Sequence, residues 1–110
     1  MLVSSWVGSS WDSPSKITLK GQIVYMNLYD DGSIEIQNYS YGDKVTSVSK
    51  GTYTLVGTNF VGNMSATVEN VTYSGTFNAT MTSTSAYGTY TISAQGNPVW
   101  DSGYWEVTAQ

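Results

Sequence analysis

Apolar and polar residues alternate with a period of two along much of this chain. In V-T-Y-S-G-T-F-N-A-T-M-T, residues 71–82, each odd position is Val, Tyr, Gly, Phe, Ala or Met and each even one is Ser, Thr or Asn. A β-strand points successive side chains to opposite faces, so this pattern predicts a strand with one buried and one solvated face. The alternation recurs at Ile34 and Ile36; Tyr53 and Leu55; Met64, Ala66 and Val68; Tyr90, Ile92 and Ala94; and Trp105, Val107 and Ala109. We find no segment with a helical period.

Residues that favour tight turns separate these runs. They are Asp30-Asp31-Gly32, Tyr41-Gly42-Asp43, Gly57-Thr58-Asn59 and Gln95-Gly96-Asn97-Pro98. Such residues accept a positive φ or preset a turn, so short antiparallel hairpins are expected. A chain of 110 residues has room for one domain. The predicted fold is therefore all-β: a single antiparallel up-and-down β-barrel of about seven or eight strands, with a β-sandwich as the alternative.

A Gly-Thr-aromatic tripeptide occurs three times, at residues 51–53, 75–77 and 88–90. We interpret it as the opening of a strand, in which Gly permits a sharp entry, Thr faces solvent and the aromatic ring enters the core. The spacings of 24 and 13 residues match two strand-plus-turn units and then one. The repeat thus predicts strands of one meander.

One predicted strand is apolar on both faces. It is I-V-Y-M-N-L-Y, residues 23–29. We expect cover on both sides, either from an N-terminal segment, residues 1–15 with Trp6 and Trp11, packing on the barrel, or from another subunit. The second case predicts a homo-oligomer formed through this strand.

Charge and composition exclude several classes of function. Four Lys, no Arg and eight acidic residues give a net charge of −4, which disfavours nucleic acid and anionic lipid surfaces, so neither nucleic acid nor a membrane is expected as a partner. Outward Ser and Thr disfavour an outer-membrane barrel. The absence of Cys and His removes thiolate nucleophiles, His-based triads and the usual zinc ligands. The sequence therefore favours a non-enzymatic protein without a cofactor or metal.

Residues 25–60 resemble the middle of a bacterial lipocalin-like (calycin) domain. Y-M-N-L-Y-D-D-G-S-I-E-I reads as strand, D-G turn and strand, and S-K-G-T-Y-T-L-V-G-T-N-F reads as G-x-Y-x-apolar and a short turn. The second piece also resembles the G-T-Y hairpin of avidin-type barrels. Trp11, in G-S-S-W, stands near the place of the lipocalin G-x-W, with one residue more between Gly and Trp. The resemblance implies a barrel that holds a small ligand in its lumen.

Inward residues of the predicted barrel are the first candidate site. An eight-stranded barrel either is filled by side chains or holds one small ligand. Small inward residues such as Gly75 and Ala94 leave volume, and larger ones would line it. The predicted lumen residues are Tyr53, Tyr73, Phe77, Ala79, Tyr90 and Trp105. The alternative is that large and small side chains interdigitate and fill the core.

The segment N-P-V-W-D-S-G-Y-W-E is the second candidate. Trp100 and Tyr104 offer flat rings that stack on sugars, and Asp101 offers a carboxylate that bonds hydroxyls, as in a carbohydrate-binding module. Strand parity points Tyr104 and Trp105 to opposite faces, so at least one of these two rings is expected in the core.

The remaining acidic residues and the glycosylation motifs suggest no further site. Asp30 and Asp31 belong to a turn, and Glu35 and Glu69 are expected on outward strand positions, which argues against a glycosidase pair. Asn-x-Ser/Thr motifs begin at residues 38, 63, 70 and 78 and matter only in a eukaryotic secretory route.

The sequence predicts a non-enzymatic domain that binds a small, partly apolar molecule outside the cell or at the cell surface. Two alternatives stay open. One is a carbohydrate-binding module that uses Trp100, Asp101 and Tyr104. The other is a structural domain that assembles through residues 23–29 and binds no small ligand.

Overall fold

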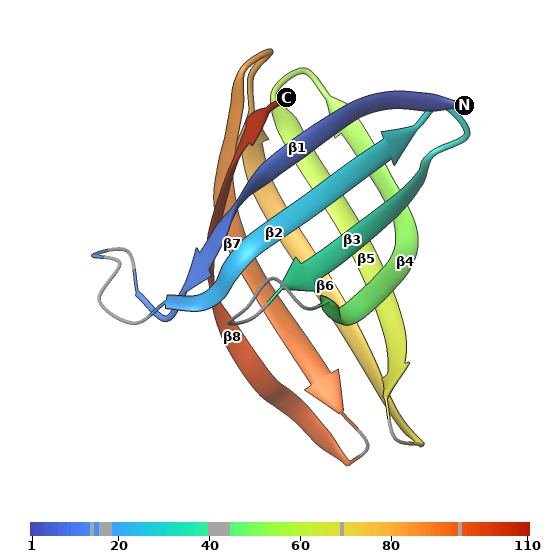
Figure 1. Ribbon diagram of the computed structural model, residues 1–110, viewed down its shortest axis with the longest axis vertical. Helices are drawn as coiled ribbons and strands as arrows, with labels where there is room; N and C mark the ends of the chain where they lie inside the picture. The colour runs from blue at the N-terminus through green and yellow to red at the C-terminus, as the bar shows by residue number, and fades with distance from the viewer. Residues whose placement is uncertain (14, 16–18, 40–44, 69, 95) are drawn as a thin grey trace.

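Eight antiparallel strands close into one barrel in the computed structural model, which describes every residue except 14, 16–18, 40–44, 69 and 95 (Figure 1). Each strand pairs with the next in sequence, and β8 pairs with β1 to close the barrel. The predicted all-β up-and-down barrel is confirmed, and the sandwich alternative is wrong. The strands are β1 (Leu2–Trp11), β2 (Leu19–Tyr29), β3 (Ser33–Tyr39), β4 (Val45–Val56), β5 (Asn59–Val68), β6 (Val71–Met81), β7 (Ser85–Ala94) and β8 (Asn97–Ala109).

Turns occur at the predicted positions that the structure describes. Gly32 and Gly57 adopt φ angles of 85° and 62°, which glycine accepts without a steric penalty. Gly96, with φ 75°, lies between β7 and β8. Asn97 and Pro98, predicted as part of that turn, already belong to β8. The predicted turn at residues 41–43 lies outside the described residues.

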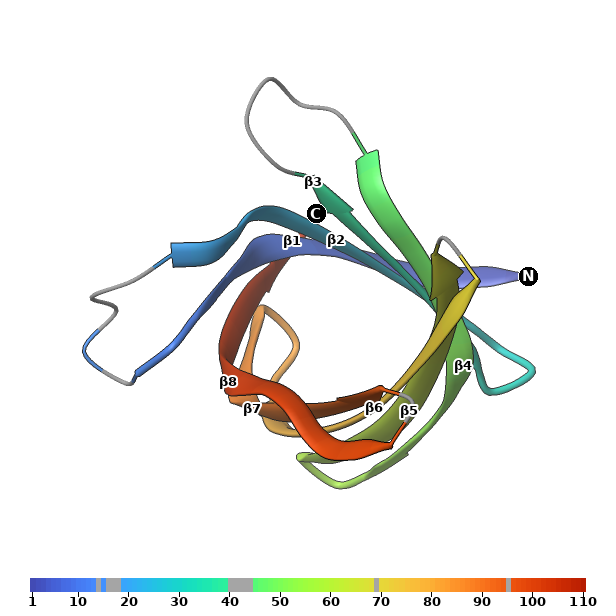
Figure 2. The same cartoon turned by 90° about the horizontal axis from the view of Figure 1, so that it is seen from below.

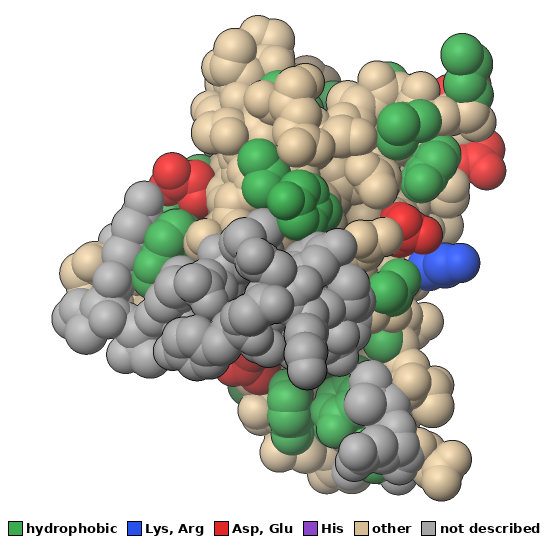
Figure 3. Space-filling view, in the orientation of Figure 1, with side chains coloured by type: hydrophobic (Ala, Val, Ile, Leu, Met, Phe, Trp, Pro, Cys, Tyr) green, Lys and Arg blue, Asp and Glu red, His purple; other side chains and the backbone are tan. Residues whose placement is uncertain are grey.

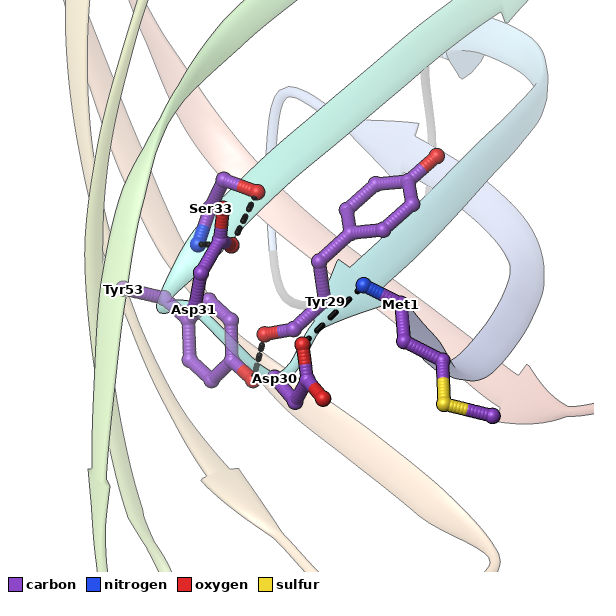
Figure 4. A network of polar contacts seen from close by, with 6 residues as sticks. All are labelled: Met1, Tyr29, Asp30, Asp31, Ser33 and Tyr53. Carbon is purple, nitrogen blue, oxygen red and sulfur yellow. Dashed lines mark hydrogen bonds and ion pairs between the residues drawn. The ribbon is translucent and has the colours of Figure 1, made fainter.

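Polar contacts hold the strand ends together around the turn between β2 and β3 (Figure 4). The amino terminus forms an ion pair with Asp30 at 3.0 Å. Asp31 accepts hydrogen bonds from the hydroxyl and the backbone N–H of Ser33, at 2.6 and 2.9 Å, which lower the pKa of the Asp31 carboxyl. Tyr53 donates its hydroxyl to the carbonyl of Tyr29 at 2.9 Å. This last bond ties β4 to β2 across the turn.

The N-terminal segment, which we expected to pack on the barrel, contributes strand β1 to the barrel wall. Figure 2 looks along the barrel and shows β1 beside both β2 and β8. Trp6 points inward and is only 5% exposed. Its indole N–H donates to the hydroxyl of Ser4 at 2.8 Å. The strand at 23–29 buries Val24, Met26 and Leu28 inside the barrel and leaves Tyr25, Asn27 and Tyr29 half-buried outside. An oligomer formed through this strand stays a prediction.

The hydrophobic core is concentrated near the end of the barrel that holds both chain termini, here called the termini end (Figure 1). Ile34 is the second residue of β3 and Phe60 is the second residue of β5, each shortly after a turn. Met81 is the last residue of β6. All three are buried because these strand ends meet there. The opposite end, where β5 joins β6 and β7 joins β8, is called the far end. Its inward residues are mostly half-buried.

The interpretation of the Gly-Thr-aromatic repeat as a strand opening is wrong for two of its three copies. Gly51 and Gly75 lie in the interiors of β4 and β6, and only Gly88 lies near a strand start. A Cβ on Gly51 would collide with the carbonyl oxygen of Asn63, and one on Gly88 with that of Asn78. Glycine is therefore required where the neighbouring backbone comes too close for a side chain. The predicted facing of the repeat is correct: its Thr residues are exposed and its rings point inward.

Glycines lie beside large inward rings at one level of the barrel. At one level, Tyr53 pairs with Gly62, Gly62 with Phe77, Phe77 with Tyr90, and Tyr90 with Gly103. The ring of Phe77 occupies the space that a Cβ on Gly62 would need. The hydroxyl of Tyr90 lies 3.0 Å from the Cβ position of Gly103. The rings of Phe77 and Tyr90 thus each lie over a glycine of a neighbouring strand, a combination of large and small residues typical of small barrels.

Few charged side chains of the described residues are in view on the face shown in Figure 3. The inward residues Phe77, Ala79 and Met81 are buried, while the intervening Asn78 and Thr80 on β6 are exposed. This matches the predicted period of two.

Candidate functional site

The six predicted lumen residues separate into two groups along the barrel. Phe77, Ala79 and Trp105 belong to the buried core, and Tyr53 packs against that core from the termini end. Tyr90, paired with Phe77, also packs against the core, whereas Tyr73 is half-buried and lies toward the far end. Five of the six candidates thus lie in or against the core, and Tyr73 lies outside it; ligand binding by these residues stays a prediction.

Phe60 organises the aromatic core and was missing from the predicted site residues. Its ring lies 5.6 Å from the rings of Tyr53 and Phe77, and 6.1 Å from that of Trp105, and the residue is 0% exposed. Phe77 and Trp105 meet edge to face at 5.9 Å. The run Met64, Ala66 extended back by period two would have found Phe60. At this level, packed rings occupy the barrel, as the alternative of a filled core predicts.

A hydrogen-bonded phenol and carboxylate lie inside the barrel beyond these rings. Tyr90 donates its hydroxyl to Oδ2 of Asp101 at 3.1 Å. Burial raises the pKa of Tyr90, and the negative charge of Asp101 raises it further, with a smaller contribution from Asp12. A hydrogen bond with Ser10 lowers the pKa of Tyr90 by less. Tyr90 therefore remains a protonated donor across the physiological pH range.

An aromatic pair lies at the far end next to this carboxylate. The rings of Tyr73, on β6, and Trp100, on β8, have centroids 4.8 Å apart and are tilted by 59°. Trp100 is 53% exposed. An irregular stretch of β8 places Trp100 there. Ile92 pairs with Asp101 and Ala94 pairs with Asn97, so β8 has more residues than β7 between these two pairs. Extra residues of this kind form a β-bulge, which changes the direction in which a side chain points from the one that strict alternation predicts.

The structure thus brings residues of both predicted sites together at the far end. We call Tyr73, Tyr90, Trp100 and Asp101 the far-end cluster. Tyr104, the third predicted carbohydrate-binding residue, does not join it. It pairs with Trp11 between β8 and β1, and it alternates with the inward, buried Trp105 as parity predicted.

The other polar residues considered in the sequence lie apart from the far-end cluster where the structure describes them. Glu35 accepts a hydrogen bond from the amide of Gln37 at 3.1 Å, and Glu69 lies outside the described residues. Asn63, Asn70 and Asn78 are exposed, and Asn70 has a φ of 67°. The described residues contain no group of three or more His, Cys, Asp or Glu side chains placed to hold a metal ion. None of the described segments is a helix long and apolar enough to cross a membrane.

The far-end cluster combines two kinds of contact. The exposed ring of Trp100, packed against the half-buried Tyr73, offers an apolar surface, and the Tyr90–Asp101 pair offers a fixed acceptor close to it in sequence and in the sheet. No family model matches this chain, and comparison with curated proteins and with solved structures finds no match. The resemblance to lipocalin-like and avidin-type proteins therefore extends to the closed antiparallel barrel alone.

Proposed function

We propose that this protein is a non-enzymatic binding domain that takes up one small, partly apolar molecule at the far end of its barrel. Its location outside the cell or at the cell surface, predicted from the sequence, is part of the proposal. The observation that carries it is the far-end cluster. The exposed Trp100, packed against Tyr73, lies next to a hydrogen-bonded carboxylate in a barrel whose other end is tightly packed.

The chemistry of the cluster supports a ligand with an apolar body and a polar group. Ligand sites are mostly apolar, with a few polar groups that set orientation. Trp100 and Tyr73 supply the apolar contact, and burying apolar surface is worth about 25 cal/mol per Å². Asp101, oriented by Tyr90, accepts a hydrogen bond from the ligand's polar group. The buried rings of the core form the floor beneath the ligand.

A fluorescence titration with a neutral probe tests this function. N-phenyl-1-naphthylamine suits the site better than an anionic dye because Asp101 and Asp12 would repel a negative charge. We expect saturable one-to-one binding to the wild type. Trp100→Ala should weaken it roughly tenfold, since losing the ring contact costs about 1.4 kcal/mol.

Val99→Ala is the matched control. Val99 precedes Trp100 on β8 and is similarly exposed, so its loss should leave probe affinity unchanged. Absence of saturable binding by a cooperatively folded wild type would contradict the proposal. So would equal affinity of the wild type and Trp100→Ala.

A further inference from the structure

The outer face of β4–β7 carries a groove of about 490 Å³ that the far-end cluster does not explain. Its walls are outward, exposed side chains, among them Lys50, Ser65, Ser74, Thr76 and Thr91. The far-end cluster lies on inward positions of the same sheet, so the two sites are on opposite faces. The volume falls within the range of small-molecule pockets, about 300–1,000 Å³.

Strand register arranges the groove side chains in two rows across the sheet. In one row, Ser65 is opposite Lys50 on β4 and opposite Ser74 on β6. In the other, Thr76 lies between Asn63 and Thr91. Neighbouring strands are about 4.8 Å apart, a distance comparable with the length of one sugar ring. The groove therefore presents polar groups at a regular interval along its length.

Four of the five Ser and Thr hydroxyls that line the groove are available to a ligand, and that of Ser93 donates to the backbone carbonyl of Ser74 at 3.2 Å. Among the described residues, the side-chain hydroxyls of Ser65, Ser74, Thr76 and Thr91 form no hydrogen bond with the protein. Elsewhere on the outer face, Thr67 and Thr72 bond each other at 3.2 Å. The four groove hydroxyls, unlike this pair, have no partner in the described part of the protein.

Charge argues for an uncharged ligand. The groove has one cation, Lys50, and it lies opposite the carboxylate-bearing Glu35 on β3. The chain as a whole has a net charge of −4, which repels anions. No aromatic residue lines the groove, so an apolar ligand would find no flat surface on which to pack.

We propose that this groove binds a short, uncharged oligosaccharide. Each Ser or Thr hydroxyl both donates and accepts a hydrogen bond, as each sugar hydroxyl does, so the two rows can pair with successive hydroxyls of the ligand. The amide of Asn63 and the ammonium of Lys50 add donors. The inference concerns a second site and does not depend on ligand binding at the far end.

A titration with cellotriose and maltotriose, followed by amide chemical shifts of the ¹⁵N-labelled protein, tests the proposal. We expect saturable shifts at groove residues of β5, β6 and β7 with at least one of the two sugars. The double variant Thr76→Val/Thr91→Val keeps the branched shape and removes two hydroxyls. It should weaken binding about tenfold, since each net hydrogen bond is worth about 0.5–1.5 kcal/mol.

The double variant Thr80→Val/Thr89→Val is the matched control. It also changes one exposed Thr on β6 and one on β7, and neither lines the groove, so sugar affinity should not change. Both variants should bind N-phenyl-1-naphthylamine like the wild type, which separates this test from that of the far end.

Three results would overturn the proposal. The first is that neither trisaccharide shifts groove amides at about 10 mM, a concentration that would detect even a millimolar Kd. The second is that shifts are confined to the far end around Tyr73 and Trp100. The third is tighter binding of trigalacturonate than of either neutral sugar, which would contradict the uncharged ligand class.

Discussion

At the scale of single residues, the inward glycines differ in what surrounds them. Alanine at Gly51 or Gly88 would push Cβ against a backbone carbonyl of the neighbouring strand. That strand is held on both sides in a closed barrel, so it cannot move away. At Gly75, the nearest atom to a Cβ is the terminal methyl of Met64 at 3.0 Å, which is flexible. The glycines of the three Gly-Thr-aromatic copies therefore differ in how well they tolerate replacement by alanine.

We predict that Gly51→Ala and Gly88→Ala each lower the free energy of unfolding by about 2 kcal/mol or more, as overpacking does. Gly75→Ala should change it by less than about 1 kcal/mol, because the methyl of Met64 can rotate aside and alanine restricts the unfolded chain. Urea unfolding followed by far-ultraviolet circular dichroism measures both. Equal losses at Gly51 and Gly75 would show that backbone proximity does not set the cost.

At the scale of elements, a single strand contributes unequally to stability along its length. Phe77 and Tyr73 both face inward on β6. Phe77 is 2% exposed among the core rings, whereas Tyr73 is half-buried against the exposed Trp100. The packing on β6 therefore weakens from the core toward the far end.

Phe77→Ala should cost about 3–5 kcal/mol, because it empties a packed site over Gly62. Tyr73→Ala should cost about 1–2 kcal/mol, since it loses mainly one ring contact and partial burial. Chemical denaturation of the two variants provides the comparison, and Thr76→Ala, exposed between them, is the control. A Tyr73→Ala loss as large as that of Phe77→Ala would mean that the far end is as tightly packed as the core.

The alternation of apolar and polar residues predicted the strands, but it did not find Phe60 or the contact between Trp100 and Tyr73. Alternation identified the strand at residues 71–82 because its inward positions are apolar or glycine and its outward positions are all polar. It missed Phe60 because a turn immediately precedes it. It also could not show that Trp100 reaches Tyr73, because the irregular stretch of β8 breaks the parity on which such reasoning depends.

At the scale of the whole molecule, β1 completes the barrel. It pairs with β2 on one side and β8 on the other, and it carries the buried Trp6. Without it, β2 and β8 would expose unpaired N–H and C=O groups, which favour association between chains. The closed form thus depends on contacts between the two ends of the described chain.

We predict that deleting residues 1–11 abolishes the closed barrel, giving an unfolded or aggregated chain. Size-exclusion chromatography with light scattering and circular dichroism would show this. Deleting residues 1–3 is the control and should leave a folded monomer, because these residues are exposed and add little pairing. A cooperatively folded monomer of residues 12–110 would contradict the role assigned to β1.

The sequence by itself determined the strand content, the inward and outward faces and the antiparallel order, because period two and turn chemistry are local properties of the chain. Only the tertiary structure decided which inward residues share a level. That depends on the register between strands, which sets Phe77 over Gly62 and Tyr90 beside Phe77. The candidate site also depends on the register between strands. The pairing of β6, β7 and β8 brings Trp100 to Tyr73 and Asp101 to Tyr90.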